Sequence, residues 1–393
     1  VPDKLPQFGA DGLCVCLHSF AQLRRRDSSL FSTITRWMLQ PQRRDDIGTE
    51  HVASLVYSHV RTLLSDKGLI SAAQTHLSSG DVDRLNSADI ATMLQAFATW
   101  NVSAPTAAQR CADLMAARES STSLPMLCDT LGALVKLDVP CKNLQRTIAK
   151  RVEANSEELD DLSIGDLSKL ILGLGGSKNS VRARVLVVSQ LKARAEELDG
   201  PQAYAQALEA LAQVSNKTPN ARDAADEVAR QMSLKVVDFS VKNIASVATA
   251  CQKLLVDNPG ALEALARQGL RKGWRFRPRY AHAVLDACDA VRFDHPILDE
   301  LRASTERYEQ EASDRREARE KEVEEDPSEP SSKLSQGRSS RGTPKTSSEH
   351  EREEQEDERE LERLLESDEI FDDFVRPGRS ASRGYLAGDA AGG

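Results

Sequence analysis

Aromatic residues are scarce in this chain of 393 residues: they make up 4% of it, against 40% hydrophobic residues overall. A large core must therefore be built from leucine, alanine and valine, as it is in stacked helix pairs. The sequence also has no run of 18 apolar residues, so we do not expect a membrane-spanning helix.

Known catalytic motifs are absent as well. There is no GxxxxGK[ST] phosphate loop, no HExxH, no GxSxG and no strand followed by GxGxxG. Gly173, Gly175 and Gly176 faintly resemble a phosphate loop, but they fall within a predicted helix and at its end. Glycine there favours close packing and then a left-handed cap. We expect no enzymatic activity, no cofactor and no metal site.

The cysteines form no CxxC pair, and their number, seven, is odd. Several stand at helix positions where a small hydrophobic residue would serve, so we interpret them as reduced core residues. Metal ligands or disulfides are the alternative. Reduced cysteines indicate a reducing compartment.

An apolar pattern recurs eight times, at intervals of 37 to 40 residues. Such a period is typical of stacked repeats. The positions four and seven residues after each anchor are apolar, except His59, which predicts one face of an α-helix. The position eight residues after is mostly small and predicts close helix packing there. The anchors are Leu13, Val52, Ile90, Leu127, Leu167, Tyr204, Ile244 and Ala281.

Each repeat also contains a second helical segment. Prolines recur 15 residues after the anchor in four repeats and two residues earlier in a fifth, and proline suits the first turn of a helix. These prolines are Pro105, Pro219, Pro259 and Pro296, with Pro140 as the early one. The segments that follow them are rich in helix formers.

The pattern predicts an all-α, right-handed αα-solenoid of about eight helix pairs over residues 1–309. A helical bundle without repeats is the alternative. The prolines favour the solenoid, because their spacing is independent of the residues that define the anchors.

The net charge of −9 belongs to the end of the chain. From Glu311 onward there are 24 acidic and 14 basic residues, which leaves 37 acidic and 38 basic before it. Residues 310–360 are charged and almost without apolar residues, so we predict a disordered linker. Residues 312–325 are also compatible with a solvated extension of the last helix. Residues 377–393 are predicted to be disordered.

Between these parts, residues 361–376 combine hydrophobic and acidic side chains. Such a segment is typical of one that folds onto a basic, grooved protein partner. A transient helix without a partner remains the alternative. The hydrophobic residues proposed to bind are Leu361, Leu364, Leu365, Phe371 and Phe374.

Polar residues recur nine positions after the anchors and include Arg61, Lys136, Gln213 and Lys253. One such residue per repeat, on the same side of each first helix, predicts a polar, partly basic stripe. Repeat proteins can read one RNA base per unit in this way. A solvated face without a ligand would have the same pattern.

A second basic feature connects the seventh repeat to the eighth. It combines basic residues for phosphate contact with Trp274, Phe276 and Tyr280 for base stacking. The alternative is a basic helix end followed by an aromatic that seals the joint between repeats, which we favour for Trp274. The basic residues are Arg271, Lys272, Arg275, Arg277 and Arg279.

The segment NSADIATMLQAFATWNVSAP and its echoes ADGLCVCLHSFAQLRRRD, LPMLCDTLGALVKLDVP and IGDLSKLILGLGGSKNS resemble octotricopeptide and heptatricopeptide repeats. These families are organellar RNA-metabolism proteins. The resemblance covers residues 5–309, and no RAP-like segment follows. Similar helical repeats are found in the RNA-editing substrate-binding complex and in mitoribosomal proteins.

The resemblance implies a non-catalytic protein that binds single-stranded or ribosomal RNA in mitochondrial RNA processing, stability or ribosome function. The implied compartment is the mitochondrion, with the plastid or cytoplasm as alternatives. The competing hypotheses are a protein scaffold of armadillo or HEAT type, which holds a peptide in its groove, and a structural subunit of a mitochondrial ribosome.

Overall fold

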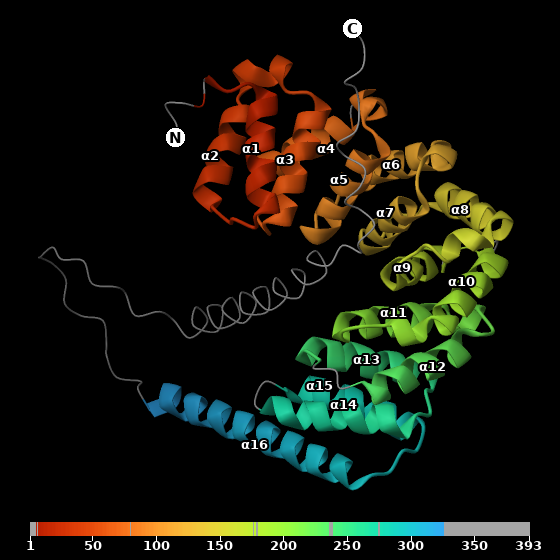
Figure 1. Cartoon of the computed structure of the whole chain (residues 1–393). Helices are drawn as coiled ribbons and strands as arrows, with labels where there is room; N and C mark the ends of the chain where they lie inside the picture. Colours follow the sequence, from red (N-terminus) through yellow and green to blue (C-terminus); the bar gives the residue numbers. More distant parts are fainter. Residues whose placement is uncertain are drawn as a thin grey trace, which may run out of the picture. The chain divides into compact units, whose positions relative to one another are not determined.

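The computed structural model describes residue 5, residues 7–78, 80–175, 177, 180–235, 239–273 and 276–325. Within these residues every regular element is a helix (Figure 1). The chain divides into one compact unit over Val1–Thr305 and a second over Glu306–Gly393. The first unit is an all-α solenoid, as predicted; its handedness stays a prediction.

The first helix of every repeat begins where the sequence pattern places it. Each anchor is the fourth residue of its helix, so all eight share one register. These odd-numbered helices are α1 (Ala10–Gln22), α3 (Thr49–Arg61), α5 (Ser87–Thr99), α7 (Leu124–Lys136), α9 (Ile164–Leu174), α11 (Pro201–Val214), α13 (Val241–Leu254) and α15 (Pro278–Ala290).

The second helices follow, and three of the five prolines open one as predicted: Pro105, Pro259 and Pro296. The second helices predicted near Pro140 and Pro219 are also present, but they start two residues later, at Lys142 and Ala221, so these two prolines precede the first turn. The even-numbered helices are α2 (Ser28–Met38), α4 (Lys67–Ser78), α6 (Pro105–Ala117), α8 (Lys142–Ala154), α10 (Val181–Ala193), α12 (Ala221–Leu234), α14 (Pro259–Lys272) and α16 (Pro296–Glu325).

Short 3-10 helices, which the pattern does not predict, join or extend the helices of the pairs. One of them, η8 (Ser215–Lys217), directly follows α11. The others lead from an even-numbered helix toward the next odd-numbered one: η2 (Pro41–Asp46), η3 (Gly80–Arg84), η4 (Glu119–Ser121), η5 (Ser156–Leu159) and η7 (Ala195–Glu197).

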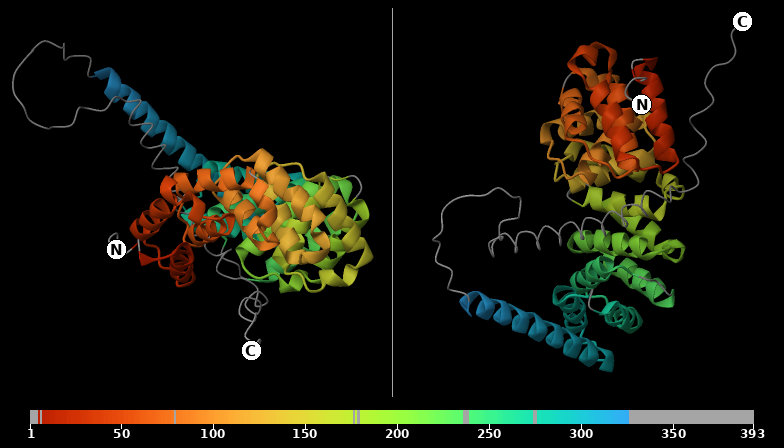
Figure 2. Two further views of the ribbon diagram at one scale, coloured as in Figure 1. Left: turned by 90° about the horizontal axis from the view of Figure 1, so that it is seen from above. Right: turned by 90° about the vertical axis from the view of Figure 1, so that its left-hand side faces the viewer.

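The helices of the first unit form two layers (Figures 1 and 2). Each odd-numbered helix packs against the next odd-numbered one, and the even-numbered helices from α4 to α14 pack against each other in the same way. All the anchors and all the residues four positions after them are buried. Leu94 and Phe97 are fully buried, as expected of core residues.

Eight residues after the anchor, the predicted close packing is found at Gly175, where a Cβ atom would lie 3.1 Å from Val214 of the next odd-numbered helix. Ala21 and Val60 at this position are also buried, whereas Ala98, Val135 and Ala212 are half-buried. A second close contact, which was not predicted, lies two residues earlier. Six residues after the anchor, every repeat from the second to the eighth has a buried small residue: Ser58, Ala96, Ala133, Gly173, Ala210, Ala250 and Ala287. This side of each helix faces the preceding repeat.

Six of the eight odd-numbered helices end in a shared left-handed cap that is not a glycine. Gly175, the C-cap residue of α9, has a right-handed conformation with φ −59° and does not supply the predicted glycine cap; Gly176 lies outside the described residues. Among the described residues, six helices place a non-glycine residue at φ 52–56° eleven positions after the anchor: Arg24, Leu63, Asn101, Asp138, Leu255 and Arg292.

The residue after each cap bonds back to the helix. The amide of Val139, for example, donates to the carbonyl oxygen of Leu134 at 3.0 Å, and five of the six residues at this position are apolar. This pattern of a left-handed residue, a returning amide and an apolar contact is the Schellman motif. It turns the chain sharply enough for the second helix to pack on the first.

The last even-numbered helix continues to Glu325 and is 30 residues long. Residues 310–325 are therefore helical, and the prediction that the linker is disordered from residue 310 is wrong. The helical extension considered for residues 312–325 is confirmed. The rest of the linker, the segment 361–376 and residues 377–393 lie outside the described residues.

His59, which interrupts the apolar column in the sequence, is a buried core residue with 2% exposure. Its Nδ1 donates to the carbonyl oxygen of Leu55 at 2.9 Å, its Nε2 lies 3.3 Å from the Thr35 hydroxyl, and its ring contacts the edge of Phe31. Burial disfavours the imidazolium form and lowers the pKa of His59.

A lowered pKa makes the stability of the first two repeats depend on pH. The unfolded chain, with an ordinary histidine pKa of about 6.5, binds the proton more tightly than the folded chain. The free energy of unfolding should therefore be highest above about pH 6.5 and fall as the pH drops toward the folded pKa. Hydrogen exchange of α2 and α3 between about pH 7 and 5 measures this decrease. A His59→Gln variant should lose the pH dependence; an unchanged dependence would assign it to other groups.

Gly173 tests the close approach of neighbouring repeats. A Cβ atom there would lie 2.7 Å from the Leu131 Cβ atom, whereas one at Gly165 in the same helix would meet nothing closer than 3.7 Å. Overpacking costs about 1–3 kcal/mol, and replacing a helical glycine returns roughly 1 kcal/mol. Gly173→Ala should lower the free energy of unfolding in urea by a net value of up to ~2 kcal/mol. Gly165→Ala should leave it equal or higher, and equal effects of the two changes would contradict the packing described.

Candidate nucleic-acid interface

One face of each odd-numbered helix is not used for stacking. Successive residues at −2, +2, +5 and +9 from the anchor share this face, because they are three to four positions apart. On α13 these residues are Lys242, Ser246, Thr249 and Lys253, and all four are exposed or half-buried. This face of the odd-numbered layer, which we call the outer face, is where side chains can meet a ligand.

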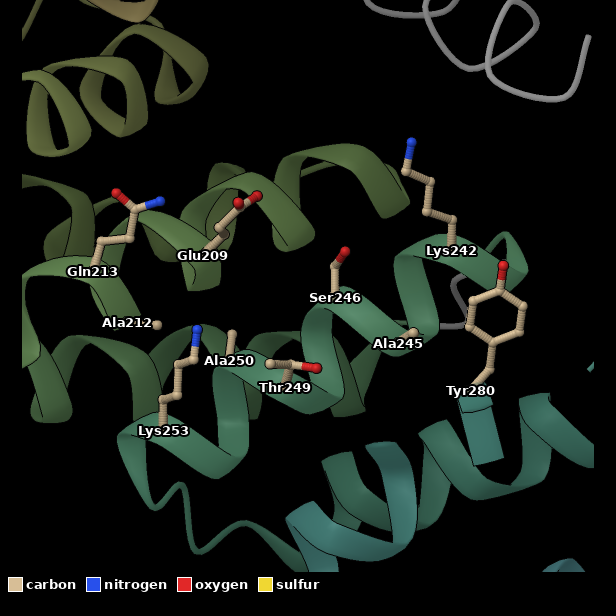
Figure 3. A pocket seen from close by; sticks show the side chains of 10 residues that line it. All are labelled: Glu209, Ala212, Gln213, Lys242, Ala245, Ser246, Thr249, Ala250, Lys253 and Tyr280. Carbon is tan, nitrogen blue, oxygen red and sulfur yellow. The ribbon is translucent and has the colours of Figure 1, made fainter. Parts of the chain in front are cut away.

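A pocket of about 310 Å³ opens on the outer face between α11, α13 and the start of α15 (Figure 3). Lys242 and Tyr280 lie at one end of it, and Gln213 and Lys253 lie at the other. The remaining lining residues are Glu209, Ala212, Ala245, Ser246, Thr249 and Ala250.

The lining combines small apolar residues with polar groups that suit an anionic, hydrogen-bonding ligand. Two lysines oppose a single glutamate, Glu209, so the lining has a net positive charge. Lys253 is exposed, and within the described residues it makes no hydrogen bond or ion pair. The hydroxyls of Ser246 and Thr249 can donate and accept.

The pocket exists because short side chains line this part of the outer face. In the fifth repeat, the position two residues after the anchor is Lys169, whose Nζ atom bonds to Asp129 at 2.7 Å and Asp166 at 3.2 Å. The Lys169 side chain lies over Gly132 of the preceding repeat. In the seventh repeat the same position is Ser246, which leaves the groove open.

The structure brings together only two of the four residues proposed for the RNA-binding stripe. Gln213 and Lys253 line the same pocket. Arg61, half-buried at the end of α3, and Lys136, exposed at the end of α7, belong to other repeats and do not line it. The stripe is therefore present on the outer face, and two of its residues line the pocket at α11 and α13.

The basic cluster lies at the junction between α14 and α15. Arg271 and Lys272 form the last turn of α14, and Arg277 precedes the first residue of α15. Arg271 and Arg279 are exposed, whereas Lys272 and Arg277 are half-buried. Arg275 and Trp274 lie outside the described residues.

Arg279 connects this cluster to the pocket. Its guanidinium carbon lies 4.5 Å from the centre of the Tyr280 ring, and the guanidinium donates a hydrogen bond to the Tyr280 hydroxyl. Because Tyr280 lines the pocket, the positive charge of Arg279 is at its edge.

Phe276 has a structural role, and its proposed role in base stacking is wrong. It is 8% exposed, and a Cβ atom at Gly269 would lie 2.6 Å from its Cε1 atom. Phe276 therefore seals the joint between α14 and α15, as the alternative hypothesis predicted for an aromatic of this cluster. Tyr280, the other described aromatic of the cluster, is half-buried.

The cysteines lie outside the pocket lining, and all seven are unpaired; six are buried, which confirms them as core residues. Burial raises the pKa of the thiols of Cys14, Cys141 and Cys288 to about 11 and of Cys111 and Cys251 to about 12. Such thiols remain protonated at neutral pH. Among the described residues, no cluster of histidine, cysteine and carboxylate side chains could hold a metal ion.

Sequence reasoning missed four polar residues of the pocket: Glu209, Lys242, Ser246 and Thr249. The polar stripe identifies only the position nine residues after the anchor, although −2, +2 and +5 share its helical face. Helical geometry alone would have identified them. The hydrophobic residues proposed at 361–376 lie beyond the described residues, so no contact can be assigned to them.

No protein-family model matches the chain, and no curated protein matches it. No helix in the described part of the chain combines the length and apolar character that crossing a bilayer requires.

Proposed function

We propose that this protein binds single-stranded RNA on the outer face of its odd-numbered helices, without catalysing a reaction. The observation that carries the proposal is the open pocket, in which Gln213 and Lys253 of the stripe meet Lys242 and Tyr280. The resemblance to octotricopeptide and heptatricopeptide repeats supports an organellar, mitochondrial role in RNA processing, stability or ribosome function.

The chemistry of the lining fits an unpaired nucleotide. Ala212, Ala245 and Ala250 offer a small apolar surface for the face of a base. Side-chain amides and hydroxyls can bond to the Watson–Crick edges of the bases, which are accessible only in unpaired RNA. The lysines at the two ends of the pocket can hold the flanking phosphates, and Arg279 adds a further cation at the edge.

The lysines provide the first test. Replacing both pocket lysines, Lys242→Gln with Lys253→Gln, removes two cations that would bind phosphate, so RNA affinity should fall. The salt dependence of binding to a short single-stranded RNA should flatten by about 0.7 for each phosphate that is no longer neutralised. Filter binding over a salt series measures both quantities.

The matched control removes two charges from the other layer. Arg146 and Lys150 are exposed on α8, and neither makes a hydrogen bond or ion pair within the described residues. The double change Arg146→Gln with Lys150→Gln should leave both affinity and salt slope nearly unchanged. If the control lowers RNA affinity as much as the change of the pocket lysines does, the RNA binds to the even-numbered layer and the proposed site is wrong. If the unaltered protein retains no RNA at low salt, the scaffold hypothesis replaces this proposal.

Ser246 provides a second test that does not depend on charge. Ser246→Leu adds an apolar side chain at the position where Lys169 fills the equivalent groove of the fifth repeat. It should weaken RNA binding because the base loses its space, but it should leave the salt slope unchanged, since no cation is removed. The same salt series measures this. Unchanged affinity would show that the pocket does not hold the base.

A further inference from the structure

The first repeat leaves one side of α1 uncovered. In repeats two to eight, the residue six positions after the anchor is buried against the preceding odd-numbered helix, but its counterpart Ser19 is exposed. Around it, two large apolar side chains are open to solvent: Phe20 is 38% exposed and Leu23 72%; Val15, on the adjoining outer face, is 64% exposed. Phe20 occupies a column that is buried in every other repeat.

The other end of the odd-numbered layer has a different surface. One and eight residues after the anchor, the preceding repeats have small or apolar residues, such as Ala205 and Val60, except for Gln252 in the seventh. In the last repeat these positions are His282 and Asp289, and both are exposed. The last odd-numbered helix therefore has the polar outer side that a terminal repeat needs for solubility, whereas α1 does not.

The uncovered side of α1 is complementary to itself in the antiparallel direction. Its residues are symmetric about a point between Leu17 and His18: Cys16 corresponds to Ser19, Val15 to Phe20, Gly12 to Leu23 and Asp11 to Arg24. Small residues thus meet at the centre, and a glycine faces a leucine farther out. Opposite charges face each other at the ends; the Asp11 side chain is 97% exposed, and its Oδ1 atom lies 3.0 Å from His51 Nε2 of the same chain.

We propose that the uncovered side of α1 binds a second copy of this chain, with the two α1 helices antiparallel about a two-fold axis. Each contact is then made twice, as a two-fold interface requires. Leu23 of each copy packs against Phe8 and Gly12 of the other, since the Phe8 ring, 43% exposed, lies beside Gly12, and Arg24 pairs with Asp11 of the other copy. This inference is independent of the proposed RNA binding.

The mass of the full chain in solution tests the interface. Sedimentation equilibrium should give a dimer for the unaltered protein and a monomer for Val15→Glu with Leu23→Glu. The matched control, Val181→Glu with Leu234→Glu, places the same charges at two other exposed apolar residues, 41% and 66% exposed, and should remain a dimer. A monomeric unaltered protein, or a control that dissociates equally, overturns the proposal.

Two further variants test the antiparallel register. Asp11→Arg should dissociate the dimer through repulsion of Arg24 of the other copy, and adding Arg24→Asp should restore it. Cys16, the one cysteine that is not buried, lies near the axis, so a short bismaleimide should join two copies through their Cys16 thiols. Cys16→Ser should abolish this product. If Asp11→Arg with Arg24→Asp does not restore the dimer, the antiparallel register is excluded. If crosslinking persists in Cys16→Ser, the contact between the two Cys16 residues is excluded.

Discussion

The stack depends on how closely consecutive odd-numbered helices approach each other. At the narrowest point, a small residue of one helix faces the preceding repeat, and at Gly173 even a methyl group would collide with Leu131. Protein interiors pack too densely for such a gap to be widened in one repeat alone. Because every repeat from the second onward keeps a small residue at this position, the same helix spacing recurs along the layer. The repeat period of 37 to 40 residues is then the number of residues between this contact in one odd-numbered helix and the same contact in the next.

Polar contacts between consecutive repeats hold this spacing on the even-numbered side. Basic residues at the ends of even-numbered helices donate to carbonyl oxygens of the linker one repeat earlier: Arg151 to Thr122 at 2.8 Å, and Arg194 to Leu162 at 2.8 Å. Arg118 and Lys235 make equivalent contacts. The short 3-10 helices leave carbonyl groups that need such donors. Since each bond joins only neighbouring repeats, the stability of the stack is a sum of local interfaces.

The odd-numbered helices and most of the even-numbered ones could be predicted from the sequence, because their apolar columns and opening prolines are local signals. The closest contact could not, since alanine and glycine are common at several positions and only the stacked neighbour decides which one is crowded. The left-handed caps were missed for a related reason: residues such as Leu63 and Arg292 adopt φ above 50° because the returning amide and the apolar contact outweigh the steric cost. Arg184, fully buried and bonded to oxygen atoms of Leu174, Ser177 and Thr218, has no signature in sequence at all.

The candidate site lies on the outer face, the face of the odd-numbered helices that stacking does not use. Residues on this face can differ between repeats, because no helix covers them. The size of their side chains decides where a ligand can enter. At the first and second repeats, Tyr57 stacks on His18 and accepts a hydrogen bond from Gln22, so the groove there is occupied by its own side chains. At the fourth and fifth, the ion pairs of Lys169 fill it. Between α11 and α13, a serine and three alanines are too short to do so, and the opening between the two lysines stays accessible to another molecule. The stripe is therefore a correct signal for the exposed face, but the size of its neighbours, rather than its own polarity, determines which part of that face can bind.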